Sequence, residues 1–97
     1  MSMRVITRRR LLEFAREHPD CSSALESWYR IMKHTNFDTF MQLRQTFPSA
    51  DRVGRLTVFN IGGNKARLIA AVHYSNHRIY IRRILTHAEY NKKDWKE

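Results

Sequence analysis

The sequence has few of the residues that form disulfides or cysteine metal sites, and it has no long apolar segment. Its 97 residues include one cysteine, two prolines and three glycines. The lone thiol, Cys21, cannot close an internal disulfide or complete a cysteine zinc site. No apolar run approaches the roughly 18 residues that cross a bilayer, and residues 1–4 lead into an arginine cluster rather than an apolar signal segment. We therefore expect a cytoplasmic protein with no membrane partner.

Carboxylates are also missing from much of the second half of the chain, where none lies between Asp51 and Glu89. Two-metal nucleases hold their ions with clustered carboxylates, so we expect no metal site and no cofactor. The whole chain has 18 lysines and arginines against nine acidic residues, a formal net charge of +9. This excess favours a polyanionic partner such as RNA, DNA, anionic lipid or an acidic protein segment.

The N-terminal part of the sequence predicts one strand followed by two amphipathic helices. Residues 5–6 favour a short strand, and Thr7 is placed to cap a helix that Pro19 would end. The spacing Ser23-x-x-Glu26 is typical of a capping box, in which two side chains satisfy backbone groups at a helix start. It predicts that the second helix begins at this point.

A third, shorter helix is expected next, capped by Asn36 or Asp38 and ended by Pro48. The following segments are rich in β-branched and aromatic residues and predict three consecutive antiparallel strands. These strands are expected at residues 56–61, 66–74 and 78–85. A second capping box, Thr86-x-x-Glu89, predicts a short C-terminal helix.

Together these elements predict an α+β fold in a single domain, residues 1–97. The N-terminal strand and two to three helices would pack on one face of a small, mainly antiparallel sheet, and the other face would be free. With 42% hydrophobic residues, the chain can close such a core without disulfides or metal.

The last two strands predict a cationic face on the sheet. A two-residue turn at residues 75–76 would place Arg67 opposite Ile84 and Ile69 opposite Arg82. Arg67 and Arg82 would then be diagonal neighbours, and a phosphate between them would relieve their repulsion. The same face would also carry His73, Arg78 and Tyr80. The alternatives are that these arginines are solvated or paired with distant carboxylates, and that a longer turn changes the pairing.

Residues near the predicted C-terminal helix can supply proton transfer. His87 would begin this helix, where the positive end of the helix dipole favours a neutral imidazole near pH 7, as a general base requires. Tyr90 would lie on the same side of the helical turn. A structural role for His87 is the alternative, and the capping box accounts for Glu89. The Gly62-Gly63-Asn64 segment is interpreted as a hairpin turn whose N–H groups could, with Lys65, also hold a phosphate.

These residue types match the needs of a nuclease that works without metal. RNA carries its own nucleophile in the 2′-hydroxyl beside the scissile phosphate, whereas DNA does not. Cleavage by this route needs a base, cations that stabilise the crowded phosphorus, and an acid for the leaving oxygen. Side chains of these kinds are present in His87, Arg67, Lys65, Arg82 and Tyr90.

Four segments, taken in order, resemble the HigB family of mRNA interferase toxins, and the similarity extends over nearly the whole chain. They are residues 58–64, Arg67, residues 80–82 and the closing Thr86-His87-Ala88-Glu89-Tyr90. The resemblance implies a RelE-like fold and metal-free mRNA cleavage, often on translating ribosomes. It also implies a HigA-type antitoxin that silences the toxin and represses their operon, so that operator DNA is contacted only through the antitoxin.

The resemblance also suggests roles for individual residues. Arg67 resembles the phosphate-binding arginine of RelE-like toxins, and His87 and Tyr90 resemble the C-terminal residues that those toxins use for proton transfer. RNA or phosphate contacts are expected from Lys65, Arg82, Arg83, Asn60 and Arg78.

Two other functions fit the same composition. One is a basic module that binds RNA or the ribosome and blocks translation by occupancy without cleaving RNA. The other, which the sequence favours less, is a DNA-binding protein that uses the arginines at residues 8–10. These arginines could also lie at a solvated helix start, or meet ribosomal RNA or an acidic antitoxin segment. Trp95 is expected to clasp the C-terminal segment, or else to stack on a base.

Overall fold

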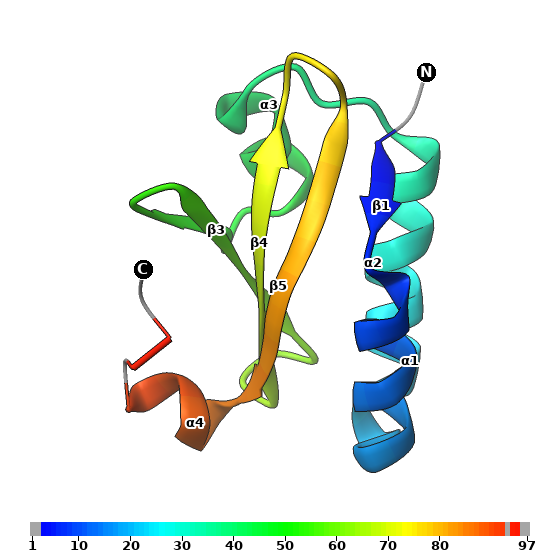
Figure 1. Cartoon of the computed structure of the whole chain (residues 1–97), viewed down its shortest axis with the longest axis vertical. Helices are drawn as coiled ribbons and strands as arrows, with labels where there is room; N and C mark the ends of the chain where they lie inside the picture. Colours follow the sequence, from blue (N-terminus) through cyan, green and yellow to red (C-terminus); the bar gives the residue numbers. More distant parts are fainter. Residues whose placement is uncertain (1–2, 93, 96–97) are drawn as a thin grey trace.

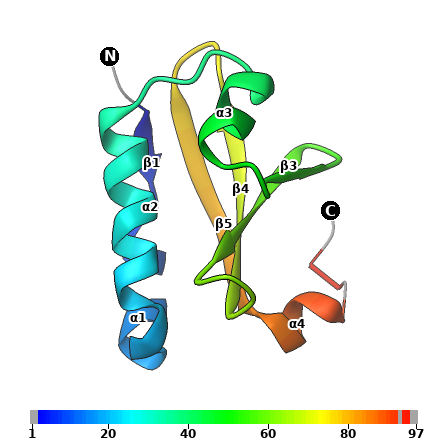
Figure 2. The ribbon, with the colours of Figure 1, turned by 180° about the vertical axis from the view of Figure 1, so that it is seen from behind.

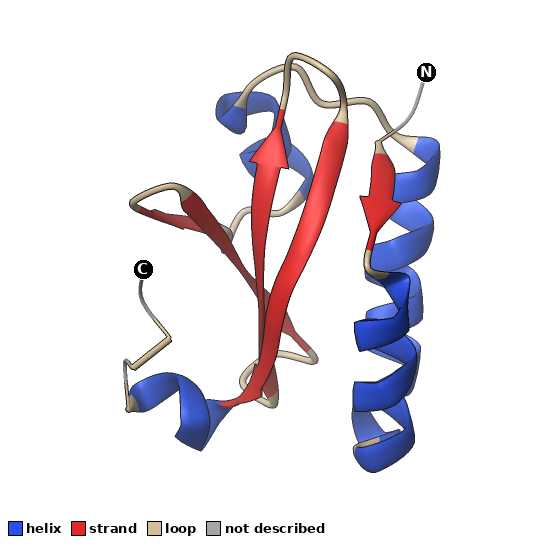
Figure 3. Cartoon of the chain, in the orientation of Figure 1, coloured by secondary structure: helices blue, strands red, loops and turns tan. Residues whose placement is uncertain are grey.

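A computed structural model describes residues 3–92 and 94–95 of the chain. The sheet is formed by strands β1 (Arg4–Ile6), β2 (Asp51–Val53), β3 (Leu56–Ile61), β4 (Ala66–His73) and β5 (Arg78–Thr86). The helices are α1 (Arg8–Glu17), α2 (Ser22–His34), α3 (Phe40–Thr46) and α4 (His87–Asn91), and a 3₁₀ turn, η1 (Pro19–Cys21), joins α1 to α2 (Figures 1 and 3). The α+β prediction is therefore confirmed.

The strands form one five-stranded sheet with the order β1-β5-β4-β3-β2. The first strand pairs in parallel with β5, and all other neighbours are antiparallel. The three predicted strands are present, whereas the short edge strand β2 was not predicted. Three residues are too few to show a strand periodicity, and β2 exists because it can pair with β3. No helix in the described part of the chain is long and apolar enough to cross a membrane.

The starts of the first two helices differ from the predicted caps. Thr7 precedes α1 with a left-handed backbone, φ 70°, and its side chain does not cap the helix. Its hydroxyl instead lies within hydrogen-bond distance of two carbonyls, those of Ile6 and Ile81, the latter at 3.3 Å. The second contact joins the start of α1 to the middle of β5. The predicted capping box of Ser23 and Glu26 is wrong as well. Because η1 runs directly into α2, Cys21 occupies the cap position and Ser23 already lies inside the helix.

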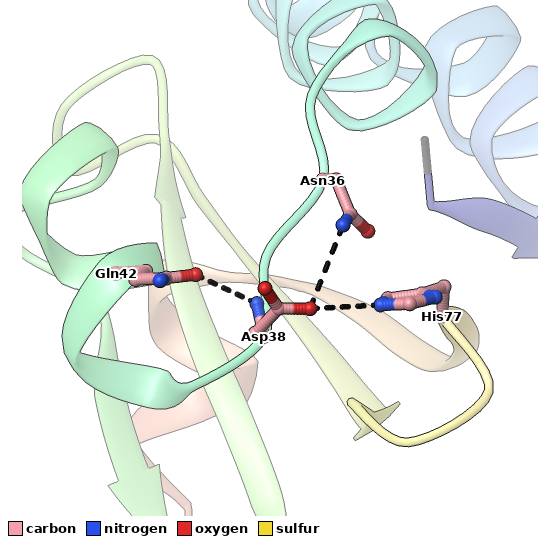
Figure 4. A network of polar contacts seen from close by, with 4 residues as sticks. All are labelled: Asn36, Asp38, Gln42 and His77. Carbon is pink, nitrogen blue, oxygen red and sulfur yellow. Dashed lines mark hydrogen bonds and ion pairs between the residues drawn. The ribbon is translucent and has the colours of Figure 1, made fainter. Parts of the chain in front are cut away.

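The third helix is capped by Thr39 rather than by Asn36 or Asp38, because the Thr39 hydroxyl accepts a hydrogen bond from the Gln42 N–H at 3.2 Å. Asp38 has another role (Figure 4). Its backbone N–H donates to the Gln42 side chain at 2.8 Å, and its carboxylate lies 2.9 Å from Nε2 of His77 in the β4–β5 turn. Asp38 thus ties the start of α3 to the end of the hairpin.

The main core lies between one sheet face and the first three helices. Figure 2 shows α2 and α3 on the same side of the sheet. The ring of Trp28 on α2 meets Phe59 on β3 edge to face, with centroids 5.5 Å apart, and Phe47 after α3 meets the same ring at 5.2 Å. Phe59 therefore joins both helices to the centre of the sheet.

The opposite sheet face is not free, which corrects the sequence-based prediction. A smaller apolar cluster on this face contains Leu56, Val58, Ile69, Ala71 and Trp95. Trp95 is 5% exposed and comes from the segment after α4, which folds back toward the sheet once α4 has left the end of β5 (Figure 1). The burial of this indole confirms that Trp95 clasps the C-terminal segment, and its apolar area is a sufficient reason for the segment to dock.

Candidate functional site

A β-bulge in the last hairpin decides which basic side chains meet. Near the turn the pairing is the predicted one, with Ala70 opposite Ile81. The register then shifts between Ile69 and Ala70, so that Ile69 pairs with Arg83 rather than with Arg82. Arg67 correspondingly pairs with Leu85 rather than with Ile84. The predicted pairing is therefore wrong beyond the bulge, because a bulge inserts one extra residue into one strand and moves every later pair by one position.

The bulge places two consecutive arginines beside one cavity. Arg82 and Arg83 are exposed and both line an open cavity of about 590 Å³ together with Ile69. Arg10 from the start of α1 and Trp95 from the C-terminal segment also line it, as does one carboxylate, Asp94. The cavity therefore combines apolar walls with three guanidinium groups, a composition suited to a ligand that carries both phosphates and flat rings.

A second cavity of about 400 Å³ adjoins the first, since Leu56 and Arg82 line both. It is also lined by Arg55 and His73. We call the two cavities together the basic groove. Because the groove lies on the sheet face opposite the main core, a long ligand can reach it without displacing any helix of that core.

Arg67 lines neither cavity of the basic groove, but its strand partner Leu85 lines the first one. It is largely enclosed, with 8% of its surface exposed. Its Nη1 donates to the carbonyls of Ala66 at 3.0 Å and Gly63 at 3.3 Å, and its Nη2 donates to Oδ1 of Asn64 at 3.1 Å. The guanidinium carbon lies 5.5 Å from the ring centroid of Tyr90. Arg67 thus joins the β3–β4 turn to α4 through hydrogen bonds on one side and a cation–π contact on the other.

Tyr90 continues this arrangement toward the groove. Its ring is stacked on Trp95 with centroids 4.9 Å apart and planes 18° apart, and its carbonyl accepts a hydrogen bond from Nε1 of Trp95 at 2.9 Å. Arg67, Tyr90 and Trp95 therefore form a continuous stack, with Trp95 in the groove wall. This stack fixes the C-terminal segment against the sheet.

His87 is the first residue of α4, as predicted, and it is exposed. Its backbone N–H donates to the carbonyl of Lys65 at 3.3 Å, which holds the helix start beside the β3–β4 turn. Because His87 and Tyr90 are three positions apart on one helix, their side chains lie on the same side of α4. The helix thus presents an imidazole next to the phenol that contacts Arg67.

The capping box of α4 is present with both of its hydrogen bonds, which confirms the prediction. The Thr86 hydroxyl accepts from the Glu89 N–H at 3.2 Å, and the Glu89 carboxylate accepts from the Thr86 N–H at 2.9 Å. The bond from the Thr86 backbone is the main cause that lowers the pKa of Glu89 below its ordinary value of 4.5, and burial opposes it. Glu89 therefore serves the helix start, as expected.

The structure does not bring every predicted phosphate ligand to this place. Asn60 does lie there, because it pairs with Arg67 across β3 and β4 and is exposed. Lys65 instead reaches the helical layer, where its Nζ donates to the carbonyl of Asp20 at 3.3 Å. Arg78 lies at the hairpin end of β5, paired with Arg4 of β1, roughly 30 Å of strand away from the start of α4.

Sequence reasoning missed several groove residues. Arg10 enters the groove because β1 pairs with β5 and Thr7 bonds to Ile81, long-range contacts that no local pattern signals. Asp94 and Arg55 were not expected to contribute either. Arg55 lies in the short turn between β2 and β3. Its place in the groove could have been predicted from the sequence only if β2 had been recognised as a strand. In residues 3–92 and 94–95, no three His, Cys, Asp or Glu side chains gather as a metal site would require.

The fold and the groove define a class of protein: a small α+β domain that presents a basic, partly apolar groove to a polyanion. Comparison with known proteins identifies the family. Residues 21–93 match the model of the HigB toxin family, described as the RelE-like toxic component of a toxin-antitoxin system. The chain belongs to this family, and its RelE-like fold is the one expected.

Several relatives align over most of the chain. An mRNA interferase HigB from Escherichia coli O6:H1 is 37% identical over 93% of this chain and 90% of its own length. The mRNA interferase toxin HigB from Escherichia coli (strain K12) and an mRNA interferase HigB from Shigella flexneri are each 33% identical over 92% of this chain and 88% of their own length. The family match over residues 21–93 includes Arg55, His73, Arg82 and Arg83 of the groove and the whole of α4.

Proposed function

We propose that this chain is an endoribonuclease toxin that cleaves mRNA by attack of the RNA 2′-hydroxyl, without a metal ion. The observation that carries the proposal is the basic groove with its two adjacent arginines, Arg82 and Arg83. Trp95 in the wall of this groove stacks on Tyr90 of α4, the helix that begins at His87. The names of the relatives, mRNA interferases, support the same activity. A groove that binds phosphates next to proton-transfer groups is what this reaction requires.

We assign the following roles in cleavage to individual residues. Arg82 and Arg83 bind the phosphates that flank the cut and stabilise charge on the crowded phosphorus. His87 and Tyr90 take the proton from the 2′-hydroxyl and return one to the leaving 5′ oxygen, so no proton is gained or lost overall. Arg67 holds Tyr90 in place through the face of its ring, and we propose that it also contributes to binding the same phosphate. Lys65 and Arg78 lie apart and add only to the long-range attraction of RNA.

The protein's partners follow from the same proposal. The substrate is mRNA, cut on translating ribosomes, and the basic charge of +9 steers the chain toward this polyanion. A HigA-type antitoxin silences it, and operator DNA is reached only through that antitoxin. The site of action is the cytoplasm, and the activity resides in a single domain, residues 1–97.

The test is induced expression of the wild type and the His87→Ala variant, with mapping of new mRNA 5′ ends in each culture. We expect new ends with the wild type and at least a hundredfold fewer with the variant, the usual loss when a general acid or base is removed. His87 is exposed, so thermal unfolding of the variant should match that of the wild type. An Asp94→Asn variant is the matched control, because Asp94 is the carboxylate of the same cavity.

Three results would change the proposal. Growth arrest by the wild type without new RNA ends would replace the nuclease with a module that blocks translation by occupancy. Loss of cleavage with Asp94→Asn, but not with His87→Ala, would indicate that the Asp94 carboxylate, and not His87, transfers the proton. Purified chain that prefers particular DNA duplexes would favour the DNA-binding alternative.

A further inference from the structure

We propose that the second cavity of the basic groove is a subsite for an unpaired nucleotide of the RNA, separate from the place where the strand is cut. This inference rests on the proposed function and adds the form of the substrate. The cavity measures about 400 Å³ and is lined by Arg55, His73 and Arg82, among others. Nothing in the cutting reaction itself requires Arg55 or His73.

The charges around this cavity suit a phosphate chain. Arg55 comes from the turn between β2 and β3, whereas Arg82 comes from β5, so the two arginines approach the cavity from opposite sides of β4. Both are exposed, and among residues 3–92 and 94–95 no carboxylate lines the cavity. Two like charges without a counter-ion favour an anionic ligand between them.

An aromatic pair gives the same cavity a surface for a base. The rings of His73 and Tyr80 meet edge to face with centroids 4.9 Å apart and an angle of 63°. His73 is exposed, whereas Tyr80 is half-buried, so Tyr80 holds the imidazole in a defined position above the sheet. Exposed flat side chains beside arginines are the usual platform on which unpaired bases stack.

The spacing of the two cavities fits one continuous strand. Ile69 lines the first cavity, and His73, four residues along β4, lines the second. Four residues of a β-strand span roughly 13 Å, a distance that a short stretch of extended single strand can cover. Arg82 lines both cavities and can contact the phosphate between them. A base-paired nucleotide could not stack on His73, so the ligand is single-stranded.

The test measures binding of a fluorescent 2′-O-methyl nonanucleotide, which lacks the attacking hydroxyl, to the purified full chain by anisotropy. We expect Arg55→Ala and His73→Ala each to weaken binding about tenfold. Arg55→Ala should also reduce the slope of log affinity against log salt by about one, because one phosphate contact is lost. Arg16→Ala, the loss of an exposed arginine on α1, is the charge-matched control and should change affinity less than twofold.

A rescue variant separates stacking from general damage to the fold. His73→Phe keeps a flat ring, so it should bind the nonanucleotide within about twofold of the wild type, and none of these variants should weaken binding of a perfect RNA duplex by more than the control does. Losses no greater than those of Arg16→Ala, failure of the phenylalanine rescue, or no detectable binding to the wild type would each overturn the subsite. Because this assay records no cleavage, the subsite and the nuclease can fail independently.

Discussion

Among single residues, Arg67 shows how one side chain supports the candidate site. Its guanidinium donates three hydrogen bonds, to the carbonyls of Gly63 and Ala66 and to the side chain of Asn64. It also faces the ring of Tyr90 at 5.5 Å. Lysine has a single ammonium group and cannot reproduce the planar fork or the stacking. The residue expected from the sequence to bind phosphate is thus also the residue that positions the tyrosine.

We predict that Arg67→Lys lowers the free energy of unfolding by about 1–3 kcal/mol, because it removes charged hydrogen bonds from a buried group. Cleavage should fall as well, since Tyr90 loses its contact. Thermal unfolding and 5′-end mapping measure the two effects. Arg83→Lys is the comparison, because Arg83 is exposed and its replacement by lysine should hardly change the free energy of unfolding. Equal stability of the two variants would contradict the positioning role.

Among the elements, α4 depends on few interactions. It has five residues, and isolated helices of that length are unstable in water. The helix is held by the capping box of Thr86 and Glu89, by the stack of Tyr90 on Trp95 and by the bond from His87 to Lys65. Because the proposed proton-transfer residues lie on α4, these few contacts control their placement.

We predict that the docking of α4 weakens in acid because Glu89 becomes protonated. Its pKa is lower in the folded protein than the ordinary value of 4.5, so its contribution is complete above about 4.5 and is lost as the pH falls through the lower folded value. The indole N–H signal of Trp95, which reports the bond to Tyr90, provides the measurement by NMR. A Glu89→Gln variant keeps a neutral version of the cap and should lack this titration. An unchanged titration in that variant would refute the assignment.

The whole molecule has apolar clusters on both faces of one sheet. The larger cluster includes Leu68, which is fully buried at the centre of β4, and the smaller one is closed by Trp95. The strand β4 therefore contributes to both clusters at once and connects the helical layer to the groove.

We predict that Leu68→Ala lowers the free energy of unfolding by about 2–5 kcal/mol, because it leaves a cavity that the surrounding side chains can fill only in part. The total free energy of unfolding of a small domain is only about 5–15 kcal/mol. Leu12→Ala, at a position that is 54% exposed, should cost much less. Chemical denaturation of the purified variants gives both values, and similar losses at the two positions would contradict this description of the core.

Local sequence patterns determined most of the elements and part of the site. The strand residues of β3, β4 and β5, the capping box of α4 and the positions of His87 and Tyr90 were predicted correctly, because each depends on neighbours within a few residues. The caps of α1, α2 and α3 were predicted wrongly for different reasons. The Thr7 hydroxyl bonds to Ile81 instead of capping α1, and η1 runs directly into α2. Helix α3 had competing polar residues at its start, among which Thr39 is the cap.

Only the tertiary structure decided how the groove is assembled. The bulge beside Ile69 changes the partners of Arg67 and Arg83, and no sequence signal marks it. Arg10 enters the groove through the parallel pairing of β1 with β5, which joins residues more than 70 positions apart. Trp95 closes the opposite face because its apolar ring is more stable there than in water. The sequence by itself determined a basic α+β protein with a histidine and a tyrosine on a short C-terminal helix. The contacts between distant segments determined which arginines line the groove, since such contacts depend on packing and not on local spacing.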